Sequence, residues 1–173
     1  MTRVRAGGFY GWPWYYIGGN EDPHHRGERP DLKDKVTVAD VLIEAHSASL
    51  GMTIYDGSQF PNDYRGSIFA AEHGSWNRSK RTGYKVVRVI MKDGVPTGEY
   101  EDFATGFVIN DSTVWGRPAG VTVDKDGGAA DFRGRQWHGL ARLLYRPIGI
   151  GPLAVAVPGL GPPGTADGGN ALL

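Results

Sequence analysis

An aromatic run near the start of the chain is the first group of residues that could do chemistry. Trp12, Trp14, Tyr15 and Tyr16 lie within the glycine-containing segment 7–16. Flat aromatic faces stack on sugar rings, which suits a saccharide substrate or a glycan-binding module. Trp and Tyr are also heavily buried in small sheets, so packing between sheets is the alternative. Trp12 and Trp14 are our candidates for substrate binding.

A metal site is the second kind of chemistry to consider. His24 and His25 stand beside Glu21 and Asp22. Adjacent side chains diverge on a strand or loop, and metal ligands usually sit at wider spacings, so we interpret this segment as a solvated loop. Tyr10 with the two acids could join a structural calcium site, but no spaced run of carboxylates supports one. The metal ligands therefore stay unknown.

A basic string offers a third kind of site, a nucleic-acid surface. It consists of Arg78, Lys80, Arg81, Lys85 and Arg88, with Trp76 and Tyr84 interleaved. Alternation along a strand sends Lys85 and Val86 to opposite faces, and nearby acids balance the charge. Lys plus Arg equals Asp plus Glu at 19 each, so the net charge is 0 and no overall field recruits nucleic acid. We expect no nucleic-acid partner.

The elements that must position these residues are strands. Glycine (27) and proline (11) recur between short apolar stretches, and no long segment holds a period of 3.6, which is typical of an all-β protein. We predict strands over residues 38–43, 52–55, 67–72, 84–91, 98–103 and 118–123. Residues 20–35 are polar and contain two prolines, which indicates an excursion loop.

Asp-Gly pairs indicate the turns between these strands. Asp93-Gly94 follows the β-branched run 84–91, so we predict a hairpin there. Asp56-Gly57 and Asp126-Gly127 each follow an apolar stretch that begins near a glycine. This weak repeat is of the kind that propeller blades show.

Composition changes after Gly128. Residues 129–173 contain no Lys, Glu or Ser, and Gly, Ala, Leu, Pro and Arg dominate. Back-translation advanced by one nucleotide reads Gln136-Trp137-His138-Gly139 as Asn/Ser-Gly-Thr/Met, and permitted codons turn 129–145 into two strands around a glycine turn. We therefore expect residues 1–128 to form the β portion and 129–173 to be an out-of-frame tail, the alternative being a disordered Gly/Pro/Ala tail.

Cysteine and hydrophobicity set further bounds. The chain has no cysteine, which excludes disulfides, thiol catalysis and Cys-ligated metals. The apolar stretch 148–160 is short and broken by Pro and Gly, so we expect no membrane span. No signal peptide is readable at the start, so the chain as written would stay in the cytoplasm.

Four segments carry a resemblance to a known family. They are GGFYGWP (7–13), HSASLGM (46–52), HGSWNR (73–78) and VWGRPAGV (114–121). In order and spacing they resemble the C-terminal part of the glucose/sorbosone dehydrogenases. The resemblance covers residues 7–127. It implies a six-bladed β-propeller, about two blades of which are encoded here, with an irregular C-terminal tail.

The resemblance also implies a function. The family consists of often periplasmic quinoproteins that use pyrroloquinoline quinone (PQQ) and calcium to oxidise an aldose or sorbosone-like sugar. They pass electrons to an external acceptor, a quinone or a cytochrome. The family's general-base histidine and catalytic calcium ligands lie upstream of the segment that matches 7–13, so we expect no catalytic residue here and an inactive fragment. Whether this chain is itself an enzyme stays open.

Five residues are our candidates for cofactor binding, because a flat, carboxylate-bearing quinone needs cations of fixed geometry and hydrogen-bonding partners. They are Arg117, His46, Ser47, Arg78 and His73. Arg117 matches a family arginine that faces the quinone, and its alternative role is stacking on Trp115. Arg78 could instead belong to a hydrated loop, and each histidine could be a structural hydrogen-bonder.

Two alternatives remain for the whole chain. One is a non-catalytic carbohydrate-binding β-module that uses the Trp12–Tyr16 face. The other is a truncated or frameshifted gene product without a function.

Overall fold

The computed structural model describes residues 1–114, 116–123, 131–134, 141–142 and 153–154. The chain forms two compact units, residues 1–43 and residues 44–173. The predicted turn at Asp126-Gly127 and most of the segment 129–173 lie outside the described residues. The change of reading frame that we predict for 129–173 therefore stays a prediction.

The first unit contains little regular structure. Its elements are β1 (Tyr15–Tyr16), β2 (Asn20–Glu21) and the 3₁₀ helices η1 (Pro23–His25) and η2 (Pro30–Lys35). β1 pairs antiparallel with β2, and the buried Tyr15 donates its hydroxyl to the carbonyl of Arg29 at 2.9 Å. The predicted excursion loop over 20–35 thus contains short helices and one short strand, because Pro23 and Pro30 each begin a helical turn.

The strand predicted over 38–43 is wrong. This segment forms no strand, although Val41 is buried and its amide donates to the carbonyl of Met1 at 3.0 Å. The Arg3 guanidinium pairs with Asp40 at 3.1 Å. Val41 is thus buried without a strand ladder, whereas Val38 and Leu42 are about half exposed.

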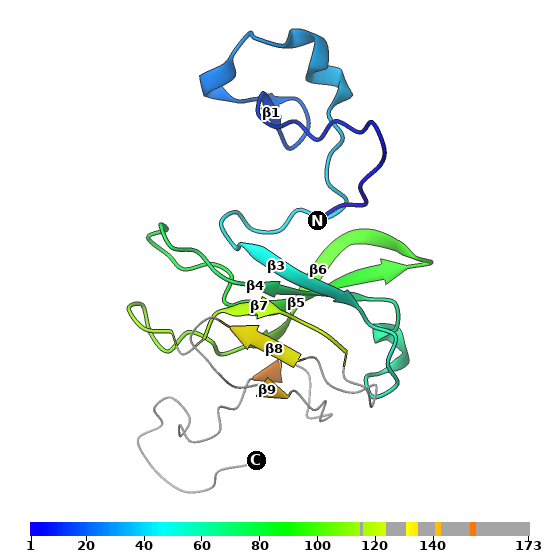
Figure 1. The fold of residues 1–173 in the computed structure, drawn as a ribbon, viewed down its shortest axis with the longest axis vertical. Coiled ribbons are helices and arrows are strands. Elements are labelled where there is room, and N and C mark those ends of the chain that lie inside the picture. The colour runs from blue at the N-terminus through cyan, green and yellow to red at the C-terminus, as the bar shows by residue number, and fades with distance from the viewer. Residues whose placement is uncertain (115, 124–130, 135–140, 143–152, 155–173) are drawn as a thin grey trace, which may run out of the picture. The chain divides into compact units, whose positions relative to one another are not determined.

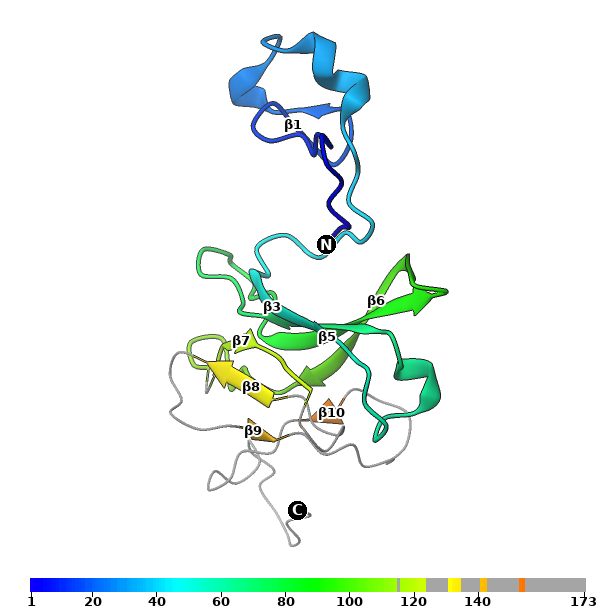
Figure 2. The same cartoon turned by 45° about the vertical axis from the view of Figure 1, so that its right-hand side comes forward.

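The second unit is built on a four-stranded antiparallel meander (Figure 1). Its strands are β3 (Ser49–Ile54), β4 (Ile68–Glu72), β5 (Lys85–Lys92) and β6 (Val95–Thr105), and η3 (Asn62–Tyr64) lies between β3 and β4. β10 (Leu153–Ala154) pairs parallel with β6. A second sheet contains β7 (Pro118–Gly120), β8 (Asp131–Gly134) and β9 (Ala141–Arg142). Figures 1 and 2 both show β7 and β8 along one face of the meander.

The structure confirms five of the predicted strands with shifted bounds, namely those over 52–55, 67–72, 84–91, 98–103 and 118–123. It also confirms the Asp93-Gly94 hairpin, since Lys92 pairs with Val95 and both turn residues have positive φ, 51° and 75°. A turn at Asp56-Gly57 is wrong, because the chain passes through η3 before β4 begins. The mostly-β prediction is confirmed, whereas the described sheets are open and the propeller stays a prediction.

Aromatic rings fill the core between the meander and η3. Phe69 on β4 and Phe103 on β6 meet edge to face at 4.6 Å, and Phe60 stacks on Tyr55 at 4.6 Å. Val86, Ala104, Phe107 and Val121 complete this buried cluster. Burial of such rings is worth several kcal/mol, about 25 cal/mol per Å² of apolar surface, and it holds the strands whose ends carry the site.

A glycine contact brings β3 against β7. A Cβ placed on Gly51 would lie 2.7 Å from the Cα of Gly120 and 2.8 Å from the carbonyl oxygen of Ala119. Backbone atoms cannot rotate away, so only glycine permits this approach. The segment leading into β7, which carries Arg117, is held close to the meander in this way.

Candidate functional site

Three loop segments meet at one end of the meander. They are residues 44–48 before β3, residues 73–84 between β4 and β5, and residues 116–117 before β7. The amide of His73 donates to Ala48 at 3.0 Å, and the amide of Gly74 donates to Ser47 at 2.8 Å. These bonds and those of the two arginines link the segments that carry four of the five candidate cofactor residues, namely Ser47, His73, Arg78 and Arg117.

Arg117 lies directly beside His73. Its Nε donates to the carbonyl of His73 at 3.1 Å and its Nη2 donates to the carbonyl of Gly74 at 2.6 Å. The guanidinium also lies 5.3 Å from the ring centre of Tyr84. A guanidinium has five N–H donors, so these two bonds fix its plane and leave donors for a ligand. Trp115, the stacking partner in our alternative, lies outside the described residues.

His73 is half-buried and oriented by the segment after Arg117. Its Nδ1 lies 3.1 Å from the carbonyl oxygen of Pro118. A carbonyl only accepts, so Nδ1 carries the proton in the neutral ring and Nε2 is an acceptor. The histidine and the arginine are thus bound to each other's backbone segments.

The segment around His46 combines exposure with backbone strain. His46 and Ala48 have φ of 66° and 54°, in the left-handed region that non-glycine residues rarely adopt, at a cost of about 1–3 kcal/mol each. His46 is exposed, whereas Ser47 between them is buried and its hydroxyl finds no partner among the described residues. Such strain clusters at ligand sites, but it is compatible with a structural role as well.

Arg78 is bonded to the segment before β3. Its Nη1 donates to the carbonyl of Ala45 at 3.1 Å and lies 3.4 Å from the Glu44 carboxylate. The hydrated loop that we gave as the alternative to cofactor binding by Arg78 is therefore anchored by these two contacts. Arg78 and His46 lie on segments that these bonds tie together.

Two buried residues at this end were missed from the sequence. Glu72, at the end of β4, is fully buried; its Oε1 accepts from the Ser49 hydroxyl at 2.7 Å and its Oε2 has no partner among the described residues. Burial raises the pKa of this carboxyl above its usual range. Tyr84 is buried against Gly74, with Arg81 and Arg117 both near its ring. No local pattern marks either residue, because both read as ordinary strand positions.

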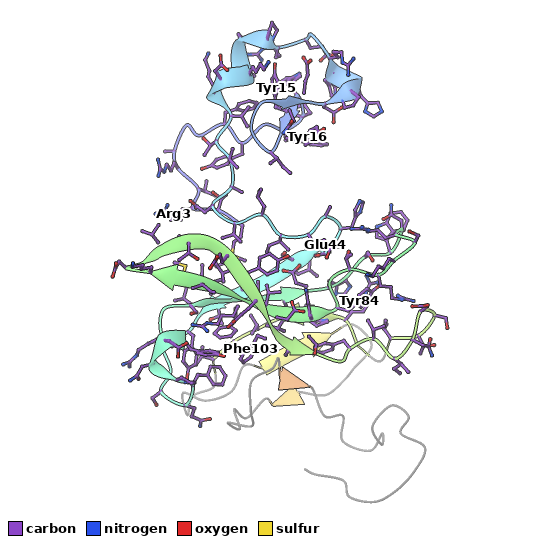
Figure 3. The ribbon with its side chains drawn as sticks, turned by 180° about the vertical axis from the view of Figure 1, so that it is seen from behind. Arg3, Tyr15, Tyr16, Glu44, Tyr84 and Phe103 are labelled. Carbon is purple, nitrogen blue, oxygen red and sulfur yellow. The ribbon has the colours of Figure 1, made fainter. Side chains whose placement is uncertain are left out.

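An open groove of about 290 Å³ adjoins these loops. Glu44, Arg81, Lys85 and Asp102 line it, with opposite charges in equal number. Lys85 donates to Asp102 at 2.5 Å, so much of this charge is internally paired. Figure 3 shows Glu44 and Tyr84 near each other beside the meander.

The candidate substrate residues lie in the first unit. Trp12 is 85% exposed. Trp14 is half-buried, 6.3 Å from the ring of Phe9, and the Arg29 guanidinium lies 5.0 Å from its ring centre. Trp14 therefore has packing partners within its own unit, whereas the indole of Trp12 faces solvent.

The two histidines of the first unit each contact an acidic side chain, and Glu21 binds a main-chain amide. His24 Nδ1 lies 3.1 Å from Asp22, His25 Nδ1 lies 3.0 Å from Glu28, and Glu21 accepts from the amide of Gly27. The Tyr10 hydroxyl contacts main-chain atoms of residues 3 and 5. Within the described part of the chain, no group of three or more His, Asp or Glu side chains could hold a metal ion.

Comparison with protein families decides where this chain belongs. The TrAA12-like family model matches residues 26–129, which is more than half of the chain. The chain belongs to the TrAA12-like family. This TrAA12-like chain is also 34% identical over 119 residues to an uncharacterized protein of Borreliella burgdorferi (strain ATCC 35210 / DSM 4680 / CIP 102532 / B31), covering 68% of the chain and 31% of that relative.

Solved structures with the same fold include Trichoderma reesei Carbohydrate-Active Enzymes Family AA12. Its iodide structure is 21% identical with a TM-score of 0.54, over 74% of the TrAA12-like chain and 37% of that one. Its calcium structure is 20% identical with a TM-score of 0.52, over 72% and 35%. The holo form of the pyranose dehydrogenase PQQ domain from Coprinopsis cinerea is 24% identical with a TM-score of 0.49, over 67% and 31%.

The TrAA12-like chain thus spans about a third of the length of the proteins it matches. Among its described residues, none of the helices is both long and apolar enough to pass through a bilayer.

Proposed function

We propose that this chain is the C-terminal part of a PQQ-dependent quinoprotein oxidoreductase, a six-bladed propeller that oxidises an aldose or sorbosone-like sugar. Membership of the TrAA12-like family and the fold shared with a carbohydrate-active enzyme support the proposal. The four segments that resemble glucose/sorbosone dehydrogenases support the finer assignment. The antiparallel meander β3–β6 has the strand order that one propeller blade requires.

The observation that carries the proposal is the convergence of Arg117 and His73. Their segments are 44 residues apart, yet Arg117 donates to the carbonyls of His73 and Gly74. The fixed guanidinium keeps unused donors and the His73 ring keeps an acceptor, so this pair fits a ligand that carries both carboxylates and carbonyl oxygens. Arg117 would bind a carboxylate and His73 would hydrogen-bond a ring substituent.

PQQ, when bound, would supply the redox chemistry as a hydride acceptor. The residues of this chain would bind and orient it and exclude water. We assign the general base and the calcium ligands to parts of the protein outside this sequence. We propose a quinone or a cytochrome as the external electron acceptor, and the periplasm as the location of the complete protein.

The test is a titration of the chain with PQQ, in which quenching of tryptophan fluorescence measures binding. Arg117→Gln should weaken binding about 10-fold or more, because a charge-assisted hydrogen bond is worth about 1.5–3 kcal/mol. Lys92→Gln, at the far end of β5, is the matched control that also removes one cation. Because Arg117 also braces two carbonyls, Arg117→Lys provides a variant that keeps the charge. Equal affinities for the Arg117→Gln and Lys92→Gln chains would refute the assignment.

A second candidate function is a carbohydrate-binding β-module. Trp12 at 85% exposure and Tyr16 at 50% exposure leave two aromatic faces of the first unit in solvent. Retention on immobilised polysaccharide without quinone, lost in Trp12→Ala, would favour this function. Quinone-dependent dye reduction by a chain extended upstream would favour the enzyme.

We also propose that the segment after residue 128 is read out of frame. The family match ends at residue 129, where the composition changes. Sequencing the genomic DNA across this point tests the proposal. A one-nucleotide correction that restores Asn/Ser-Gly-Thr/Met after β7 would complete the last blade, and a genuine reading would refute the frame change.

A further inference from the structure

The loop between β4 and β5 presents a tryptophan to solvent. Trp76 is 85% exposed, whereas Ser75 immediately before it is buried. A single exposed apolar side chain is common at protein surfaces and by itself indicates nothing. Trp76 differs from such a side chain because hydrogen bonds anchor the loop on both sides of it.

The backbone before Trp76 is fixed by a set of hydrogen bonds. The Ser75 amide donates to the Thr82 carbonyl at 2.9 Å, and the Thr82 amide donates to the Ser75 hydroxyl at 3.1 Å. The buried Tyr84 hydroxyl donates to the Ser75 carbonyl. These bonds close the base of the loop and leave its outer part, including Trp76, outside the sheet.

The backbone after Trp76 is anchored to a second segment. Arg78 donates to the carbonyl of Ala45 at 3.1 Å and pairs with Glu44, and the Thr82 hydroxyl donates to the same carbonyl at 3.2 Å. The exposed indole therefore stands between two anchored points. Binding of a ligand there costs less conformational entropy, because the loop is already ordered.

The surroundings of Trp76 offer polar groups to a ligand. The charge of Arg78 is balanced by Glu44, whereas Lys80 and Arg81 follow further along the loop. Asn77 next to the indole offers both a donor and an acceptor, and the exposed His46 follows Ala45. The loop lies at the same end of the meander as Arg117.

We infer that Trp76 is the stacking residue for a pyranose ring at the entrance to the site. The C–H face of a pyranose packs on an aromatic plane, while its hydroxyls bond to polar groups at the rim. The inference rests on the proposed function for the class of substrate. It assigns the contact to Trp76 in the second unit, whereas the aromatic run of the first unit is the competing place.

The experiment uses the full chain labelled with ¹⁵N at its five indole nitrogens. Trp76→Phe identifies the Trp76 resonance, and the remaining signals report whether each variant is folded. Glucose and sorbitol are titrated separately, because sorbitol has the hydroxyls of a hexose without a ring face. We expect glucose to shift the Trp76 indole signal with saturation in the millimolar range, and sorbitol to leave it unchanged.

Variants locate the binding site. Trp76→Ala should weaken glucose binding about 10-fold, and Trp76→Phe should retain most of it because the phenyl ring still stacks. Val95→Ala, at the turn on the far end of the meander, should bind glucose as the parent does. Equal shifts with sorbitol, or a loss of binding in Trp12→Ala instead of Trp76→Ala, would overturn the inference.

PQQ binding to the same samples separates this inference from the proposed function. If the quinone binds and glucose leaves the Trp76 signal unchanged, the inference is wrong and the proposed function stands. If glucose shifts Trp76 and the quinone does not bind, the inference holds as a sugar site and the quinoprotein proposal is wrong.

Discussion

Replacing Arg88 by alanine should strongly destabilise the second unit. Arg88 lies on β5 with only 8% of its side chain exposed. Its Nε donates to the buried Ser67 hydroxyl at 3.0 Å, its Nη1 donates to Glu101 at 2.9 Å, and its Nη2 donates to the main chain of Asp63. The guanidinium also lies 3.7 Å from the ring centre of Tyr64, so it fastens η3 to the meander.

The magnitude follows from what each partner loses. The carboxylates of Asp63 and Glu101 are 68% and 45% exposed, so water replaces the arginine there at small cost. The buried Ser67 hydroxyl loses its partner, at about 1–3 kcal/mol. Loss of the cation–π contact with Tyr64 adds about 0.5–2 kcal/mol. We expect a total loss of about 1.5–5 kcal/mol in the free energy of unfolding.

Native-state hydrogen exchange is the appropriate assay, because it reports the second unit separately from the first. The free energy of opening at the amides of Val87 and Val89 should fall by the amount given above. Lys92→Ala, at the exposed end of the same strand, is the matched control and should change it by less than about 0.5 kcal/mol. If Arg88→Ala lowered the free energy of opening at these amides no more than Lys92→Ala does, the bonds from Arg88 to η3 and the meander would not stabilise the second unit.

Three further predictions test other parts of the structure. Glu72→Gln should raise the thermal midpoint at pH 7, because burial raises the pKa of Glu72 and the ionised carboxylate therefore destabilises the folded state. This gain should vanish below pH 4.5, the ordinary pKa of the carboxyl, where Glu72 is protonated in both states. A gain that is independent of pH would contradict this cause. Asp40 should behave oppositely, since Arg3 lowers its pKa to about 2; the stability it contributes is lost as the pH falls from 3.8 toward 2, and Asp40→Asn should abolish that dependence in thermal melts. Gly51→Ala should cost about 1–3 kcal/mol in urea unfolding, whereas Gly120→Ala, whose Cβ meets open space, should be neutral, and equal effects would refute the packing argument.

The strands were predictable wherever local chemistry specifies them. The β-branched run of β5 followed by Asp93-Gly94 predicts a hairpin, because positive φ at both turn residues suits that pair. The same reasoning was wrong at Asp56-Gly57 and at 38–43. An Asp-Gly pair permits a turn without requiring one, and an apolar run can be buried without a strand partner.

The sequence proposes candidate site residues, which stay a prediction, but it does not give their arrangement. Resemblance to a family selected Arg117, His73, His46 and Ser47, and the structure brings these segments to one end of the meander. The burial of Glu72 and Tyr84 at this end was missed, because an acid or a tyrosine at a predicted strand position looks the same in sequence whether it is exposed or packed. Arg88 belonged to a basic string in the sequence, and the structure buries it.

The sequence by itself determined the mostly-β class, the hairpin and the segments that resemble a family, because periodicity, turn chemistry and short motifs are local properties. Only the tertiary structure decided that Arg117 meets His73, that Gly51 meets Gly120 and that Trp76 stands exposed on an anchored loop. These facts depend on contacts between residues far apart in the chain. Sheet register and packing create such contacts, and no local pattern encodes them.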